Sequence, residues 1–250
     1  MTEKMDTDKK NPQSPENASI PKSDPTRNTC LRCGTCCEKG GPSFHLEDRM
    51  LIEKGKIHSK SLYTLRRGEH AYDNIKGCLM PVTSDIIKIK GQEDSWTCIF
   101  FDAGEKACSI YNDRPAECRA LKCWDTDALE QIYNRNRLTR KDLILQVKGL
   151  WDLIEDHQAR CDYEKIKNLI KDLDGRKKDG AQRKLLEIIR YDTEVRKLVV
   201  AQGGLDSAML DFIFGRPLTK TLQNYGIKVR QDGKKTFIHL LLHPRQIGRI

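Results

Sequence analysis

The chain has 250 residues, a formal net charge of +9 and 10 cysteines. At about 150 residues per domain, this length predicts one or two domains with a real hydrophobic core. Only 38% of the residues are hydrophobic, and no stretch approaches the roughly 20 consecutive apolar residues of a membrane span, so none is expected. Residues 1–23 lack the apolar segment of a secretory signal, so we expect a cytoplasmic protein.

The first 125 residues contain few signals for long regular elements. Residues 1–28 are polar and carry almost no bulky apolar side chains, which predicts a disordered tail. Glycine and proline interrupt residues 29–125 repeatedly, which is typical of a loop-rich module. Two short strands are expected near Ile86–Lys90 and Trp96–Phe101, on either side of a turn-like segment. Asp113 is expected to cap a short helix that has Pro115 in its first turn.

Residues 126–250 show helical periodicity. Apolar residues over 143–154 lie on one helical face, with Thr139 and Asp142 as a capping pair in front of them. The same spacing predicts helices over 163–173 and 185–200, and a short one from Asp206 to Gly215. Near the end, Asp232-Gly233 between β-type residues predicts a hairpin. The expected fold class is therefore α+β: a loop-rich cysteine-cluster module, then a mainly helical C-terminal half with a terminal β-hairpin.

Nine of the ten cysteines lie before residue 125. Because disulfides are rare in a reducing compartment, closely spaced thiols there more often hold a metal or do redox chemistry. The densest run has two-residue gaps, which allow thiolates to converge on one metal, and in a helix its members would share a face. Four thiolates from so short a run do not easily surround one ion, so further ligands are expected from later cysteines. The run is Cys30, Cys33, Cys36 and Cys37, and the later candidates are Cys78, Cys98, Cys108, Cys118 and Cys123.

These residues leave several alternatives open. The thiols suffice for two four-ligand sites, or for one iron–sulfur cluster with thiols to spare. Cationic neighbours would stabilise either kind of centre, since both carry net negative charge. The nearby cations in the sequence are Arg32, Lys39, Arg114, Arg119 and Lys122. Cys161 stands apart from the others and is interpreted as a packing residue.

The two cysteine motifs together carry a resemblance to a known family. Cys-x-x-Cys-x-x-Cys-Cys, a downstream cysteine and then Cys-x-Ile-Tyr-x-x-Arg-Pro-x-x-Cys-Arg resemble the YkgJ family of zinc- or iron-chelating cysteine-cluster proteins. Flagellin lysine N-methylases are similar in the same motifs. The resemblance covers about residues 28–125 and implies zinc or iron as the cofactor, including a [4Fe–4S] cluster as one form. The metal ligands that it implies are Cys30, Cys33, Cys36, Cys37, Cys98, Cys108 and Cys118.

Two hypotheses about function follow. In the first, the module at 29–125 binds zinc or an iron–sulfur cluster, and the similarity to flagellin methylases implies methyl transfer or redox chemistry on a protein substrate. In the second, the module is a non-catalytic, zinc-stapled unit, and the helical region at 126–250 contacts a protein partner. Nucleic acid is disfavoured as a partner, because acidic residues are interspersed with the basic ones and no basic run carries aromatic residues.

Overall fold

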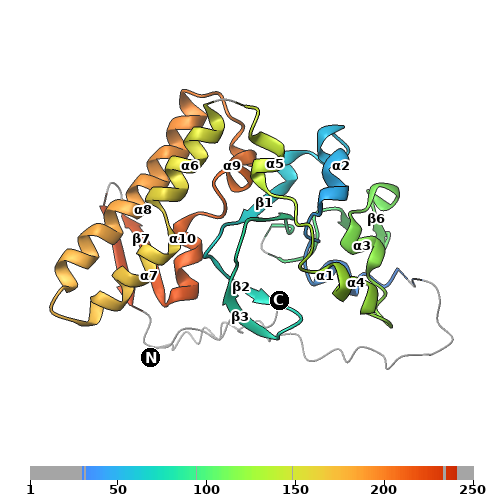
Figure 1. The fold of residues 1–250 in the computed structure, drawn as a ribbon, viewed down its shortest axis with the longest axis horizontal. Helices are drawn as coiled ribbons and strands as arrows, with labels where there is room; N and C mark the ends of the chain where they lie inside the picture. The colour runs from blue at the N-terminus through green and yellow to red at the C-terminus, as the bar shows by residue number, and fades with distance from the viewer. Residues whose placement is uncertain (1–29, 31, 94, 148, 233–234, 241–250) are drawn as a thin grey trace, which may run out of the picture.

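A computed structural model describes residues 30, 32–93, 95–147, 149–232 and 235–240 (Figure 1). The expected tail at 1–28 lies outside these residues, and so does Gly233 of the expected hairpin turn. None of the helices among the residues described combines the length and the apolar character that crossing a bilayer requires.

The N-terminal half is built from short elements joined by loops. Its sheets, among the residues described, are the three antiparallel pairs β1–β4, β2–β3 and β5–β6. The elements are α1 (Thr35–Glu38), α2 (Arg49–Glu53), β1 (Leu62–Leu65), β2 (His70–Asp73), β3 (Cys78–Pro81), β4 (Ile86–Ile89), β5 (Phe101–Asp102), β6 (Ala107–Cys108), α3 (Ala116–Ala120) and α4 (Asp127–Ile132), with single 3₁₀ turns at Leu46–Asp48, Ser59–Ser61 and Tyr111–Asp113.

One of the two expected strands in this half is present. β4 matches the expected strand at 86–90, whereas residues 96–100 contribute only an isolated bridge between Gly91 and Cys98. The reason is that both edges of β4 are already occupied. β1 pairs along one edge, and on the other the backbone of Phe44 donates to Ile87 and that of Ile89 to Pro42. The segment after the turn therefore has no edge of β4 left to join.

The C-terminal half is mainly helical and ends in a hairpin, so the expected fold class is confirmed. Figure 1 shows its long helices on one side of the molecule and the short elements α1, α3 and α4 on the other, with β1 between them. The elements are α5 (Arg140–Ile144), α6 (Leu150–Arg160), α7 (Tyr163–Lys171), α8 (Lys178–Ala201), α9 (Leu210–Ile213), α10 (Leu218–Thr221), β7 (Ile227–Asp232) and β8 (Lys235–Leu240), with 3₁₀ turns at Asp172–Asp174, Ser207–Met209 and Leu222–Tyr225.

The helix expected over 143–154 is in fact two helices. Thr139 and Asp142 form the expected capping box, with the Thr139 hydroxyl 2.6 Å from the Asp142 carboxylate. α5 ends at Ile144, however, and α6 begins only after Gly149, which has a φ of 83°. An L-residue rarely adopts that conformation, so the glycine makes the break in the helix possible although the apolar periodicity continues across it.

Two hydrophobic clusters hold the chain together. The first joins both halves, since Phe44, Leu62 and Ile87 pack in the same cluster as Ile154 and Phe212. The second lies among α7, α8, α10 and the hairpin. The cysteine-bearing half therefore shares its core with the helices that follow it.

A buried charged network lies between the helices. Asp192, on α8, accepts hydrogen bonds from Nε2 of His157 (2.8 Å), Nε of Arg196 (2.9 Å) and the backbone N–H of Leu218 (2.9 Å). Asp192 and His157 are almost completely buried. Burial lowers the pKa of His157 to about 4, even though the hydrogen bond to Asp192 opposes the shift. The folded protein thus keeps this imidazole neutral.

The burial of His157 predicts a loss of stability in mild acid. In the unfolded chain His157 takes up a proton below about pH 6.5, whereas in the folded protein it does so only near pH 4. Its contribution is therefore fully present above pH 6.5 and is lost as the pH falls toward 4, by roughly 2–3 kcal/mol at pH 4.5. Urea unfolding of wild type and His157→Gln between pH 7 and 4.5 measures this. We expect a shallower pH dependence for the variant, and equal slopes would contradict the assignment.

Candidate metal centre

The first cysteine motif bends around a glycine. Gly34 has a φ of 82° and precedes α1, which contains Cys36 and Cys37. A Cβ on Gly34 would lie 2.3 Å from the ring of Phe101, so only glycine allows this close approach. Cys30 and Cys33 lie before the helix. The run is thus not a single helix and the four thiols do not share one helical face, because the left-handed residue stops the helix from extending backwards.

The later cysteines reach the first motif through backbone contacts. The N–H of Cys98 donates to the carbonyl of Cys37 at 2.8 Å, which fixes these two residues side by side. Cys108, on β6, pairs with Phe101 on β5, the same residue that packs on Gly34. Three segments that are far apart in the sequence therefore meet at α1.

α3, which carries Cys118, is positioned by two buried carboxylates. The Asp48 carboxylate accepts from the N–H of Ala116 at 2.8 Å and so caps the helix. The expectation that Asp113 caps this helix is wrong, because Asp113 lies in the preceding 3₁₀ turn. Glu117 accepts from the N–H of Ser43 and from Nη1 of Arg137, each at 2.6 Å. α3 is thus fastened to residues on both sides of it in the sequence.

Five of the predicted thiols lie within electrostatic range of one another. Beyond the effect of burial, the pKa of the Cys118 thiol is raised by Cys98, Cys36 and Cys108, and that of Cys37 is raised by its contact with Cys36, by burial and by Cys98 and Cys118. The Cys37 contact also lowers the pKa of Cys36 to about 6, with help from Arg114. Like charges this close disfavour one another as thiolates, and a cation among them would reverse that effect.

The remaining cysteines stand further out. Cys33 is exposed, and its hydrogen bond to Thr35 lowers its pKa although the charge of Cys36 opposes the shift. Cys30 is exposed, and its Sγ accepts from the N–H of Arg32 at 3.3 Å. Cys78 and Cys123 are exposed, and no interaction among the residues described joins them to the cluster. Nor do any three of the predicted thiols, within the described chain, have all their sulfur atoms within 4.8 Å of one another.

The donor set fits zinc or iron. All ten cysteines are free thiols in this structure. The neighbouring donors are therefore thiols that lose protons when they bind a metal, and soft thiolates select zinc and iron–sulfur clusters. We name the group of Cys36, Cys37, Cys98, Cys108 and Cys118 the thiol cluster. A metal held there would draw the sulfur atoms closer together than they now lie.

Sequence reasoning missed the buried charges next to this cluster. Glu117 directly precedes Cys118, and although burial alone would raise its pKa, His45, Lys88 and Arg137 lower it to about 2. Of the cations expected from the sequence, Arg114 is the one that acts on Cys36, and it lies 3.6 Å above the ring of Tyr111. Only the position of Glu117 inside the second motif hinted at its role.

A second group of metal-type side chains lies in the helical half. Ligand atoms of His157, Cys161 and Asp192 all come within 4.8 Å of one another, and all three residues are buried. Both carboxylate oxygens of Asp192 already accept hydrogen bonds, and the guanidinium of Arg196 contacts it. Adding a cation beside a buried arginine is unfavourable, so we interpret this group as a structural network.

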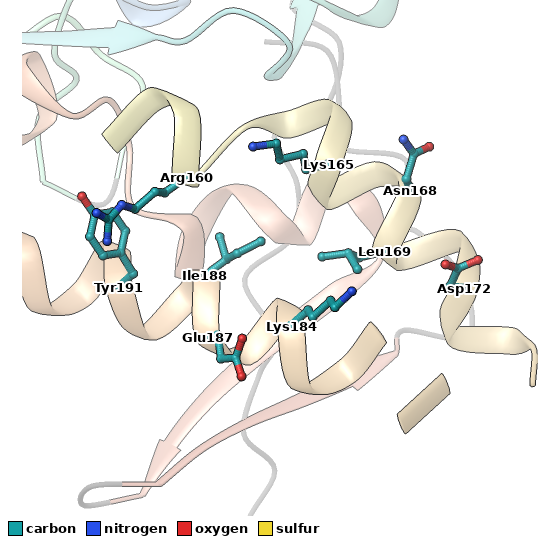
Figure 2. A pocket seen from close by; sticks show the side chains of 9 residues that line it. All are labelled: Arg160, Lys165, Asn168, Leu169, Asp172, Lys184, Glu187, Ile188 and Tyr191. Carbon is teal, nitrogen blue, oxygen red and sulfur yellow. The ribbon is translucent and has the colours of Figure 1, made fainter. Parts of the chain in front are cut away.

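A groove of about 600 Å³ lies between α7 and α8 (Figure 2). Leu169, Ile188 and Tyr191 form its apolar part, and charges of both signs, including Lys184 and Glu187, surround them. None of the cysteines lines this groove, which is therefore separate from the thiol cluster.

The comparisons with known proteins bear on the cysteine-bearing half. Residues 29–138 match a family model named CxxCxxCC, described as a putative zinc- or iron-chelating domain. No curated protein and no solved structure matches the chain. The match contains both cysteine motifs together with Asp48, Lys88, Glu117 and Arg137. It confirms the resemblance to a zinc- or iron-chelating cysteine-cluster domain. Residues 29–138 are therefore similar to the CxxCxxCC domains, which are described as putative zinc- or iron-chelating domains.

Proposed function

We propose that residues 29–138 hold zinc or iron through thiolates of both cysteine motifs, and that iron would be present as an iron–sulfur cluster such as [4Fe–4S]. The observation that carries this proposal is the hydrogen bond from the Cys98 N–H to the Cys37 carbonyl, which joins the downstream cysteine to the first motif and supports its grouping with Cys108 and Cys118 of the second. The ligands would come from the thiol cluster, and Cys30 and Cys33 would be further ligands on its solvent-exposed side. A reducing compartment, which we take to be the cytoplasm, would keep these thiols available.

Anaerobic purification followed by metal analysis and an absorption spectrum tests this proposal. We expect zinc or iron bound in a fixed ratio to the chain. A broad band near about 400 nm with about four irons and acid-labile sulfide would identify a cluster, whereas a colourless protein with bound zinc would identify a zinc site. A well-folded preparation that contains neither metal, and takes up neither when it is supplied, would contradict the proposal.

The exposed side of the cluster supports a chemical role. Cys33 and Cys36 are exposed, whereas Cys98 is buried, so a metal between them would face solvent on one side. An iron–sulfur cluster there would supply electron transfer, and a zinc ion with an open position would supply a Lewis acid. The similarity to flagellin lysine N-methylases extends the proposal to methyl transfer or redox chemistry on a protein substrate.

A purely structural zinc site is the second candidate. The observation that favours it is that Cys98 belongs to the main hydrophobic cluster and Cys37 packs against it, so a metal on these thiols would brace the edge of the core. In that case the helical half would be the part that contacts a protein partner. Unfolding measured before and after chelation separates the two roles: a structural zinc is required for folding, whereas a chemical centre is lost with little change in the fold.

A further inference from the structure

Lys88 is a half-buried lysine that has no carboxylate partner among the residues described. Lys88 lies on β4, next to Ser43, and its Nζ is 3.4 Å from the Ser43 hydroxyl. That is the one hydrogen bond of its ammonium group to the residues described, and no carboxylate there lies within 4 Å of it. Lys88 is half-buried, and an ammonium group that has lost part of its hydration normally has a carboxylate partner to compensate for that loss.

The charges that surround Lys88 do not balance it. Glu117 is the carboxylate that faces it, but Glu117 is already bonded to Arg137 at 2.6 Å. Arg216 also acts on Lys88, and its own carboxylate partner is Glu69, at 2.6 Å. Among these five groups, three are cations and two are carboxylates. Each carboxylate is bonded to an arginine, so the unpaired positive charge is that of Lys88.

Ser43 joins Lys88 to the thiol cluster, because its hydroxyl lies 3.4 Å from Nζ of Lys88 and its N–H donates to Glu117, the residue before Cys118, at 2.6 Å. Lys88 acts electrostatically on the thiols of Cys98 and Cys118, one from each of the two later segments. A centre of four thiolates on Zn²⁺ carries a net charge of about −2, and an oxidised [4Fe–4S] cluster with its ligands carries the same. A fixed cation next to such a centre stabilises the metal-bound form over the metal-free form.

We propose that Lys88 is a positioning residue of the metal centre: it is the half-buried cation that balances the negative charge of the thiolate–metal group formed by Cys98, Cys118 and the other thiols. This inference rests on the proposed function, because it requires a metal on the thiol cluster. The ammonium group of Lys88 then destabilises the metal-free protein and stabilises the metal-bound protein.

The test compares Zn²⁺ binding by the full chain with that by Lys88→Met, in competition with a chromophoric chelator and without oxygen. Methionine keeps the length of the side chain and removes its charge. We expect the dissociation constant to rise about 10–100-fold, as for other residues that surround metal ligands. Lys88→Arg should recover most of the affinity. Lys90→Met is the matched control, because Lys90 bonds instead to the carbonyls of Lys60 and Ala208 and should leave affinity unchanged.

A second measurement separates this role from a merely structural one. The urea midpoint of the metal-free protein should stay the same or rise in Lys88→Met, since the variant removes a half-buried charge that has no carboxylate partner. Equal Zn²⁺ affinity in wild type and Lys88→Met would overturn the inference. A lower metal-free stability of Lys88→Met, together with a Zn²⁺ affinity that Lys88→Arg fails to restore, would also overturn it. If the wild type itself takes up neither zinc nor iron, the proposed function fails, and this inference fails with it.

Discussion

Replacing Asp192 by asparagine is expected to lower the free energy of unfolding by about 3–5 kcal/mol, the usual cost of breaking a buried ion pair by removing one partner. The carboxylate receives hydrogen bonds from His157, Arg196 and Leu218, which lie on α6, α8 and α10. An asparagine has one acceptor oxygen, and its NH₂ group would face donors. Arg196 would then keep its charge in the interior without a carboxylate at hydrogen-bonding distance. Urea unfolding followed by circular dichroism measures the effect.

Asp156→Asn is the matched control for this variant. Asp156 also bonds to an arginine four residues away, with Nε of Arg160 at 3.0 Å, and it accepts from the hydroxyl of Tyr191. Asp156 and Arg160 are both exposed, so water hydrates Arg160 once the carboxylate is removed. The loss of stability should therefore be much smaller than for Asp192→Asn. If Asp192→Asn is no more destabilising than Asp156→Asn, the network does not hold the helices together.

The position of Asp192 explains why the helical half forms one unit with the cysteine-bearing half. Arg196 also donates to the carbonyls of Phe214 and Gly215, next to α9. Phe212 in that segment accepts from the hydroxyl of Thr64 on β1 at 2.7 Å. The buried charges among the helices are therefore connected to β1, which pairs with β4, the strand that carries Lys88. Loss of Asp192 would weaken the scaffold behind the metal centre as well as the helices.

Local patterns were sufficient to predict α7, α8 and the hairpin, although not the break between α5 and α6. The apolar spacing over 163–173 and 185–200 depends only on residues that are neighbours on one helical face, and it corresponds to α7 and α8. The Thr139 and Asp142 capping box was predicted for the same reason. The strand at 96–101 was not found as expected, because strand formation depends on a free edge elsewhere in the fold, and residues 42–44 occupy it.

The candidate site was predictable as a set of residue types but not as an arrangement. The spacing of the cysteines indicated metal binding without any tertiary information. The charges around them could not be predicted, since Glu117 bonds to Ser43, 74 residues away, and Lys88 precedes Cys98 on a different element. The sequence pointed to nearby arginines and lysines as the compensating cations, whereas the structure adds a strand residue that no cysteine motif contains.

Changing Cys118 to serine is expected to abolish stoichiometric metal binding. Cys118 is held by α3 between Asp48 and Glu117, so no neighbouring thiol on α3 can replace it. A serine hydroxyl does not ionise at neutral pH and is a poor ligand for zinc or iron. Since changes around a metal site already cost about 10–100-fold in affinity, the loss of a ligand should exceed about 100-fold. Metal analysis after anaerobic purification measures this directly.

Cys78→Ser and the Cys118→Ser variant together decide whether the cluster, rather than the number of cysteines, binds the metal. Cys78 lies on β3 opposite Asp73 and is exposed, so its removal leaves the thiol cluster intact and should leave metal content at the wild-type level. Equal losses in both variants would indicate adventitious binding to exposed thiols. Full metal content in Cys118→Ser would exclude α3 from the site, and the ligands would then have to come from the first motif with Cys98 and Cys108.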